Sequence, residues 1–386
     1  MRSMGYPLFI KITTLFGLIH SIFPTLFLAL VIGLFSINQF VDFLKVQLNL
    51  SKLSVVLATV IFLLPNIIFF NANCDGSECI AYPLFIITLH LLLKSAFNKS
   101  EKSAVWYIIS SVILILVRTQ FLFLYVVSFL LVLYLVWQSA SKKRSAIYLG
   151  SLLIISFLSI SLLDRTYHLI VNHHFRQTEY TGSQLIVPAL FNAKPGDTIL
   201  FKDPIQKGLF DSVMTALKKN ETYNFKFTKE YSEYTVVRYN HLYNLIQHRL
   251  VENYLGNIWI KKGLKLVDPD YWDFVEKTTT PMAIVLIKAH PVDYGKLYLC
   301  VLKSAMGDWT FLVPFIIIFI FSIIAFIAYR NKLSIFFLVS SILMFTNVAL
   351  VSAIEEALTR YLFYTYFALI SVVSIALLKQ FESKSE

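Results

Sequence analysis

The sequence predicts an all-α polytopic membrane protein with about nine transmembrane helices. A helix-rich α/β extracytoplasmic domain is expected to be inserted before the last three of them. Two features of composition predict this fold, since hydrophobic residues make up 57% of the 386 residues and charged residues only 15%. Soluble globular proteins hold roughly 45–50% apolar and about 25% charged residues. The third observation is that the apolar residues are gathered into long runs. A disordered chain is excluded, because this one has ample apolar surface to bury.

The apolar runs predict the individual membrane helices. A transmembrane helix needs about 20 mostly apolar residues. The fourth and fifth runs are separated only by Arg118, Thr119 and Gln120. We expect a tight turn there, because one helix over both runs would overshoot a bilayer of ~30 Å. The alternative is a single long buried helix that bends at the arginine. The runs occupy 22–44, 53–70, 79–95, 104–118, 120–138, 146–163, 309–329, 333–352 and 358–379.

Charges in the connecting segments predict the orientation. Lysine-rich segments alternate with segments that carry Asp75, Arg118 or Glu355. Lysine and arginine are retained on the cytoplasmic side of short loops. The lysine-rich segments, with twelve basic and four acidic residues, are therefore expected inside, and the others, with four of each, outside. The net charge of +11 is mainly an orientation signal, so no nucleic-acid partner is expected.

Three domains follow from this alternation. Residues 1–163 form an N-terminal membrane domain with an external N-terminal segment and six spans. Residues 164–308 hold most of the acidic residues and histidines, and they form the extracytoplasmic domain. Residues 309–386 form a C-terminal three-span domain with a cytoplasmic tail. The expected location is the bacterial inner membrane.

Local patterns predict elements within the extracytoplasmic domain. Residues 198–201 (Thr-Ile-Leu-Phe) predict a short strand after a Lys-Pro-Gly-Asp turn. Residues 205–219 and 239–254 predict amphipathic helices. Asp268 is a suitable N-cap for a helix that begins at Pro269. A metal cluster of Asp268 with the aspartates at 270 and 273 is the alternative.

The N-terminal stretch carries a resemblance. Arg2, Gly5, Tyr6 and Pro7, followed by Leu-Phe, resemble the R-x-x-GYPLF stretch of GT-C-type glycosyltransferases. These polytopic enzymes use polyprenyl-phosphate sugars and include protein O-mannosyltransferases and lipid A aminoarabinose transferases. Shorter matches in the same order extend the resemblance over most of the membrane part. They are Pro65 with Glu78, Arg118-Thr119-Gln120, His290-Pro291, and Glu356 with Arg360-Tyr361.

The sequence departs from that family at its beginning. In the family the Gly-Tyr-Pro stretch follows the first membrane helix, and the catalytic acid lies upstream of it in the first external loop. The resemblance therefore implies that this helix and this acid are missing from the chain. An in-frame extension in the DNA upstream of Met1 would restore the family pattern.

Transfer from a polyprenyl-phosphate sugar sets the chemistry expected of the site. It needs a carboxylate for the acceptor hydroxyl, cations for the phosphate and an apolar groove for the lipid tail. Charged groups at membrane depth are costly and mark function by default. We expect Glu78 and Asp75 to be catalytic. The expected phosphate-binding residues are Arg118, Arg360 and Arg2, and the supporting residues are Glu356, Tyr361 and Tyr6.

Each of these residues also has a purely structural interpretation. A carboxylate at a helix start complements the helix dipole, an acid between small polar residues is typical of a turn, and an arginine at a span end extends to lipid headgroups. A pair four residues apart forms a helical ion pair, and tyrosines at span ends form an aromatic belt. The first three interpretations apply to Glu78, Asp75 and Arg118. The helical ion pair is Glu356 with Arg360, and the aromatic belt is Tyr361, Tyr364 and Tyr366.

Cysteine and histidine patterns indicate no established cofactor. Cys74 and Cys79 are the most plausible disulfide pair, and their spacing is not that of a zinc site. His168, His173 and His174 are interpreted as interfacial polar residues without a companion acid at ligand spacing. No cofactor is expected, with a divalent metal as the alternative. Nucleotide-binding and zincin motifs are absent from the sequence.

The expected function is sugar transfer from a polyprenyl-phosphate-linked donor to an extracytoplasmic lipid, glycan or protein acceptor, with membrane lipids as further partners. A non-enzymatic transporter, flippase or scaffold for lipid-linked sugars is the alternative, and a polysaccharide polymerase or ligase is another. Transporters carry ionisable groups near the midplane and glycine- or proline-broken helices. Here the charges lie at span ends and the chain holds only 12 glycines, which favours the transferase.

Overall fold

The computed structural model describes residues 4–14, 23–70, 76–177, 181–219, 233–268, 270–354 and 359–385. Every regular element in these ranges is a helix, and none is a strand. The chain divides into two compact units. The bundle unit comprises residues 2–177, 314–347 and 360–386, and the insert unit comprises 178–313 and 348–359.

Seven helices of the described residues are long and apolar enough to cross a membrane. The prediction of an all-α polytopic membrane protein is confirmed at this level. In their described residues the predicted runs are helical except at Arg118, but α5 has only 17 residues and the apolar part of α3 is short. The seven spans lie within α2 (Phe23–Leu48), α4 (Glu78–Asn98), η1 with α6 (Thr119–Gln138), α7 (Lys142–Asn172), α15 (Asp308–Tyr329), α16 (Lys332–Ile354) and α17 (Thr359–Ser385), whereas α3 covers Lys52–Phe70 and α5 covers Glu101–Val117.

The expected turn at Arg118 is confirmed. Helix α5 ends one residue earlier, and Arg118 adopts an extended backbone with φ −147° and ψ 117°. A short 3-10 helix, η1 (Thr119–Phe123), leads into α6 (Leu124–Gln138). The Tyr107 hydroxyl of α5 donates to the Leu124 carbonyl of α6 at 3.4 Å, so the two helices pack side by side. A single helix through the arginine is therefore ruled out.

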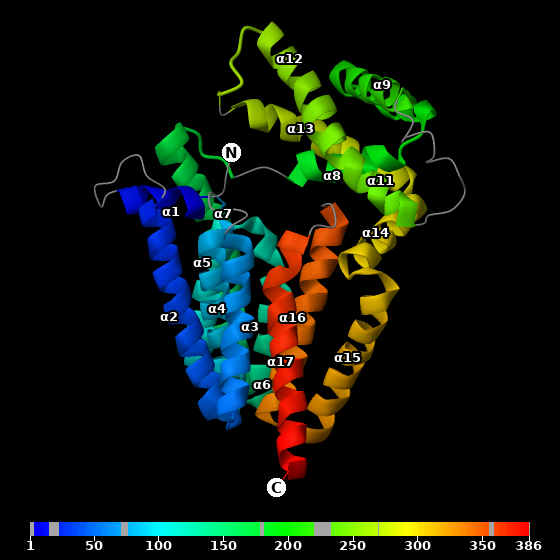
Figure 1. The fold of residues 1–386 in the computed structure, drawn as a ribbon. Coiled ribbons are helices and arrows are strands. Elements are labelled where there is room, and N and C mark those ends of the chain that lie inside the picture. The colour runs from blue at the N-terminus through cyan, green and yellow to red at the C-terminus, as the bar shows by residue number, and fades with distance from the viewer. Residues whose placement is uncertain are drawn as a thin grey trace. The chain divides into compact units, whose positions relative to one another are not determined.

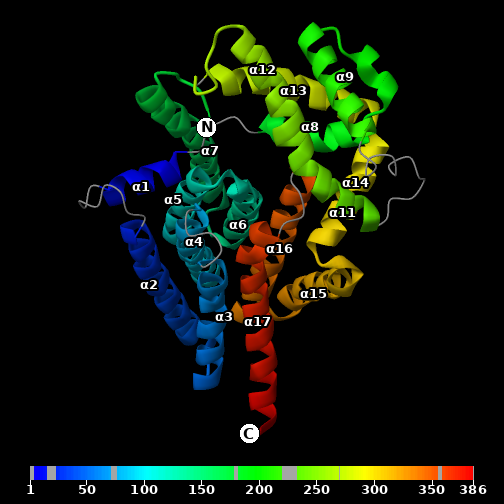
Figure 2. The same cartoon turned by 45° about the horizontal axis from the view of Figure 1, so that its top comes forward.

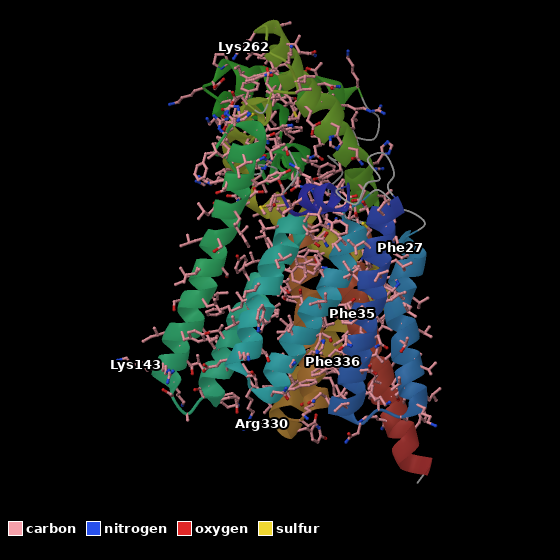
Figure 3. All side chains as sticks on the ribbon, turned by 90° about the vertical axis from the view of Figure 1, so that its left-hand side faces the viewer. Phe27, Phe35, Lys143, Lys262, Arg330 and Phe336 are labelled. Carbon is pink, nitrogen blue, oxygen red and sulfur yellow. The ribbon has the colours of Figure 1, made fainter. Side chains whose placement is uncertain are left out.

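The lysine-rich segments of the bundle unit meet at one end. The Lys379 ammonium of α17 donates to the carbonyl of Leu48, the last residue of α2. The Arg330 guanidinium lies 5.4 Å from the ring centre of Trp137, which joins the α15–α16 turn to the end of α6. Figure 3 shows Lys143 and Arg330 toward this same end of the bundle. Helices far apart in the sequence therefore share one basic end (Figure 1).

The insert unit is entirely helical in its described part, so the predicted α/β character is not found there. The predicted strand at 198–201 is wrong, since residues 195–200 form a 3-10 helix. Asp197 accepts the Lys194 backbone N–H at 2.6 Å, which closes a turn just before the apolar residues. Ile199 is 82% exposed, and no neighbouring strand pairs with it in the described part. The helices expected at 205–219 and 239–254 are confirmed.

The helices of the insert unit surround one apolar core. Figure 2 shows α8 and α13 of this unit lying side by side. The elements are α8 (Thr181–Asn192), η2 (Pro195–Leu200), α9 (Pro204–Lys218), α11 (Glu233–Asn244), a π-helical turn η4 (Leu245–Glu252), α12 (Asn253–Lys261), α13 (Asp270–Ala289) and α14 (Pro291–Ala305).

A buried carboxylate joins α13 to the start of α8. Glu276 of α13 is 8% exposed and accepts the backbone N–H groups of Gly182 at 2.8 Å and Ser183 at 3.2 Å. A helix begins with backbone donors that have no partner within the helix, and this side chain satisfies two of them. A Cβ at position 182 would lie 2.6 Å from the Glu276 carboxylate. Glycine is therefore required where the two helices meet.

Glu276→Ala is expected to destabilise the start of α8 by about 2 kcal/mol, because it removes a helix cap and leaves buried N–H groups unpaired. Amide hydrogen exchange in α8 should accelerate roughly 30-fold. The matched control is Asp273→Ala, one turn earlier on α13. Asp273 pairs with Lys277 at 2.8 Å, but the Lys277 side chain is 71% exposed, so the control should change exchange in α8 little. Equal effects of the two variants would contradict the capping role of Glu276.

Candidate functional site

The candidate site forms where the ends of two membrane helices carry opposite charges. Glu78 is the first residue of α4, and Arg118 follows the last residue of α5. The Arg118 Nη1 atom lies 2.5 Å from Glu78 Oε1, and each side chain is 12% exposed. Burying either charge alone would cost several kcal/mol, whereas a close pair compensates for much of the lost hydration. The structure thus brings together two residues that the sequence named separately.

The N-terminal Gly-Tyr-Pro stretch packs against the same helix end. Helix α1 (Gly5–Thr14) begins with the glycine of this stretch. A Cβ on Gly5 would lie 2.7 Å from the backbone nitrogen of Val117 and 2.8 Å from the Leu116 carbonyl oxygen. Only glycine permits so close an approach, because no side chain could be moved to make room. Tyr6 is 4% exposed. The described part of the stretch therefore lies beside the residue that precedes Arg118.

Helix α17 contributes a buried tyrosine to the site. The Tyr364 ring packs against Phe121 at 4.9 Å, Phe85 at 5.7 Å and Tyr82 at 6.2 Å between ring centres. Its hydroxyl forms no well-aligned hydrogen bond with a described residue, although the Arg118 side chain lies within reach of it. The charges of Arg118 and Glu78 both act on this hydroxyl. The site thus combines an ion pair with an aromatic cluster, and Tyr364 is the polar group that joins them.

The other predicted site residues are not described at side-chain level. Arg360 and Tyr361 lie in the first turn of α17, but their side chains are outside the described part of the structure. Four further residues lie wholly outside the described part of the structure. Their expected roles, and the disulfide expected with Cys79, stay predictions. These residues are Arg2, Asp75, Glu356 and Cys74.

Two tyrosines of the cluster were missed by sequence reasoning, although the sequence held a signal for one of them. The tetrapeptide Tyr-Pro-Leu-Phe occurs at 6–9 and again at 82–85. Both tyrosines are buried, and each lies near the start of its helix. The Tyr82 hydroxyl donates to the Phe62 carbonyl at 2.7 Å. The sequence placed Tyr364 only in an aromatic belt with Tyr361 and Tyr366, whereas Tyr364 is 1% exposed and reaches the site through the packing of α17.

The interpretation of His168 as an interfacial residue without a companion acid is wrong. Asp164 lies one helical turn earlier on α7, and its Oδ1 atom is 3.8 Å from His168 Nε2. The two residues are 3% and 2% exposed. The Asn172 amide nitrogen lies 2.7 Å from His168 Nδ1. These three polar residues follow one face of α7 at intervals of four, and the first two of them are buried.

Acids and histidines of the insert unit form smaller contacts. His290 Nε2 lies 2.7 Å from Asp197 Oδ2. Asp268 accepts the Lys265 backbone N–H at 2.8 Å, and Pro269, the expected first residue of the next helix, lies outside the described residues. Within the described ranges no three histidine, cysteine or acidic side chains are arranged to hold a metal ion.

No protein-family model, curated protein or solved structure matches the chain. The function therefore has to be argued from the residues of the site.

Tyr364→Phe is expected to leave thermal stability unchanged or to raise it by about 1 kcal/mol, because a buried hydroxyl without a well-aligned hydrogen bond is unfavourable. Tyr82→Phe is the matched control within the same cluster. It loses the bond to the Phe62 carbonyl and should lower stability by about 1 kcal/mol. Thermal unfolding in detergent measures both. If Tyr364→Phe lowers thermal stability as much as Tyr82→Phe does, the Tyr364 hydroxyl has a stabilising partner.

Proposed function

We propose that the protein is an integral membrane glycosyltransferase. It moves a sugar from a polyprenyl-phosphate donor to an extracytoplasmic lipid, glycan or protein acceptor. The observation that carries this proposal is the 2.5 Å contact between Arg118 and Glu78, largely buried where α5 ends and α4 begins. The resemblance of the Gly-Tyr-Pro stretch to GT-C-type enzymes supports it, as does the close packing of Gly5 beside that pair.

The pair supplies the two charged groups that the reaction needs. Arginine offers five N–H donors in a planar fork that suits phosphate oxygens. In the proposed reaction Arg118 binds the donor phosphate and stabilises the charge on the leaving polyprenyl phosphate. The acceptor hydroxyl oxygen attacks the anomeric carbon, the bond from that carbon to the phosphate oxygen breaks, and Glu78 takes the hydroxyl proton. Phosphate binding to Arg118 therefore also releases Glu78 to act as the base.

We further propose that the chain crosses the bacterial inner membrane nine times, with the lysine-rich end in the cytoplasm and the insert unit outside. Apolar side chains such as Phe27 and Phe35 of α2 are 60% and 64% exposed, as expected of a surface that faces lipid (Figure 3). At about 1.5 Å per residue, the 17 residues of α5 extend ~25 Å. With the extended residue Arg118 beyond its end, α5 comes close to the ~30 Å of a bilayer core and is counted among the spans.

Arg118→Ala and Glu78→Gln are each expected to lower kcat/KM for sugar transfer at least 100-fold, because each removes a charge that acts in the transition state. Arg118→Lys should recover only a small part of the lost kcat/KM, since an ammonium lacks the planar fork of a guanidinium. The measurement is transfer from a polyprenyl-phosphate sugar by protein in lipid nanodiscs.

Arg330→Ala is the matched control, since it removes an arginine from the other end of the bundle. Arg330→Ala loses the contact with Trp137. Its kcat/KM should stay within about threefold of wild type, because surface substitutions away from a site have small effects. Membrane insertion of all variants is verified by size-exclusion chromatography. Wild-type transfer by both Arg118→Ala and Glu78→Gln would refute the site. Translocation of a lipid-linked sugar without transfer would favour the transporter instead.

The orientation is tested separately by cysteine labelling in intact cells. In a background without Cys74, Cys79 and Cys300, a membrane-impermeant maleimide should label Lys262→Cys of the insert unit. It should label Lys143→Cys only after the cells are permeabilised, because lysine-rich loops stay in the cytoplasm. The reverse pattern would refute the proposed sidedness without bearing on the reaction.

A further inference from the structure

Asp164 is a buried carboxylate that directly follows the apolar run of α7, and the reaction proposed above does not use it. Asp164 is 3% exposed. An acidic side chain buried in a membrane helix marks function by default. Asp164 Oδ1 accepts the backbone N–H of Met4 at 3.3 Å. Met4 is the residue before α1, so a carboxylate from a distant helix caps the start of α1.

The next residue of α1 is held from a second helix. Gly5 packs so closely on α5 that an added Cβ would lie 2.7 Å from the Val117 nitrogen. Arg118 follows Val117 and pairs with Glu78. The start of α1 is thus held between a carboxylate of α7 and the backbone of α5, one residue from the arginine of the candidate site.

A histidine and an amide support the Asp164 carboxylate. The Asn172 amide nitrogen lies 2.7 Å from His168 Nδ1. When that amide donates to Nδ1, the imidazole hydrogen is on Nε2, which faces Asp164 Oδ1 at 3.8 Å. The residues lie at successive i, i+4 positions, so a single helix face orients the carboxylate toward Met4.

We propose that Asp164 is a positioning residue. It fixes the start of α1, and with it Gly5 and Tyr6, against the turn that carries Arg118, while His168 and Asn172 orient its carboxylate. The consequence for catalysis rests on the proposed function, whereas the consequence for α1 does not. Asp164 does not touch substrate in this proposal, because it is sealed from solvent behind α1.

The structural part is tested by amide hydrogen exchange of the full chain in nanodiscs. Asp164→Ala should accelerate exchange at residues 4–14 by about tenfold or more, because the cap of α1 is lost. Asp164→Asn keeps an acceptor oxygen and should restore most of the protection. Ser156→Ala is the matched control, since Ser156 is buried on the same face of α7 and its hydroxyl donates to the Leu153 carbonyl of that helix. It should leave exchange at 4–14 unchanged.

The functional part is tested by the kinetics of sugar transfer. Asp164→Ala should raise KM for the polyprenyl-phosphate donor about tenfold and change kcat less than threefold, because the displaced α1 disturbs the donor site rather than the reacting groups. Asp164→Asn should return KM to near its wild-type value. Gly5→Ala, which acts on α1 from the opposite side, should reproduce the effect of Asp164→Ala.

Three results would overturn the proposal. The first is that amide exchange at residues 4–14 is equally fast in Asp164→Ala and Ser156→Ala. The second is that Asp164→Asn does not restore protection. The third is that Asp164→Ala accelerates exchange without any change in KM. If the wild-type protein transfers no sugar at all, the proposed function fails, and the exchange data alone decide whether Asp164 holds α1.

Discussion

The bundle unit depends on one constraint, which is that a charge at the end of an apolar helix needs a partner. Arg118 interrupts an apolar segment and meets this need through Glu78, 2.5 Å away. The contact fastens the end of α5 to the start of α4. It also leaves the backbone at Arg118 extended, which sends the chain into η1 and α6. The helix ends, the turn and the aromatic cluster around Tyr364 are all arranged about this pair.

The same constraint governs the other buried acids. Asp164 caps α1 from α7, and Glu276 caps α8 from α13. In both places a carboxylate satisfies a backbone donor at the start of another helix. Gly182 lies against α13, the helix that carries the capping acid, whereas Gly5 lies against the backbone of α5. Neither acid is exposed to solvent, so each contributes by fixing the position of a helix. The bundle unit and the insert unit therefore use the same arrangement independently.

A site built from a fixed ion pair suits chemistry on a phosphate. The arginine is already held at the helix end, so a phosphate that replaces the carboxylate meets a donor that needs no reorganisation. In the proposed reaction the released carboxylate lies beside the reacting groups. Tyr364, whose hydroxyl forms no well-aligned hydrogen bond with a described residue, adds a donor within reach of both charges. In a transferase the Arg118–Glu78 pair would act on the substrate, whereas in a scaffold the pair would serve stability alone.

The sequence by itself determined the seven long apolar helices, the break at Arg118 and the helices at 205–219 and 239–254 of the insert unit, because these depend on hydrophobicity and turn chemistry within a few residues. It also named Glu78, Arg118 and Tyr6. It failed at 198–201, where apolar residues of high strand propensity follow a closed turn and lack a partner strand in the described part. Only the tertiary structure paired Glu78 with Arg118, brought Tyr364 into the cluster and connected Asp164 to α1. Such contacts join residues far apart in the chain, and the packing of whole helices decides them rather than any local pattern.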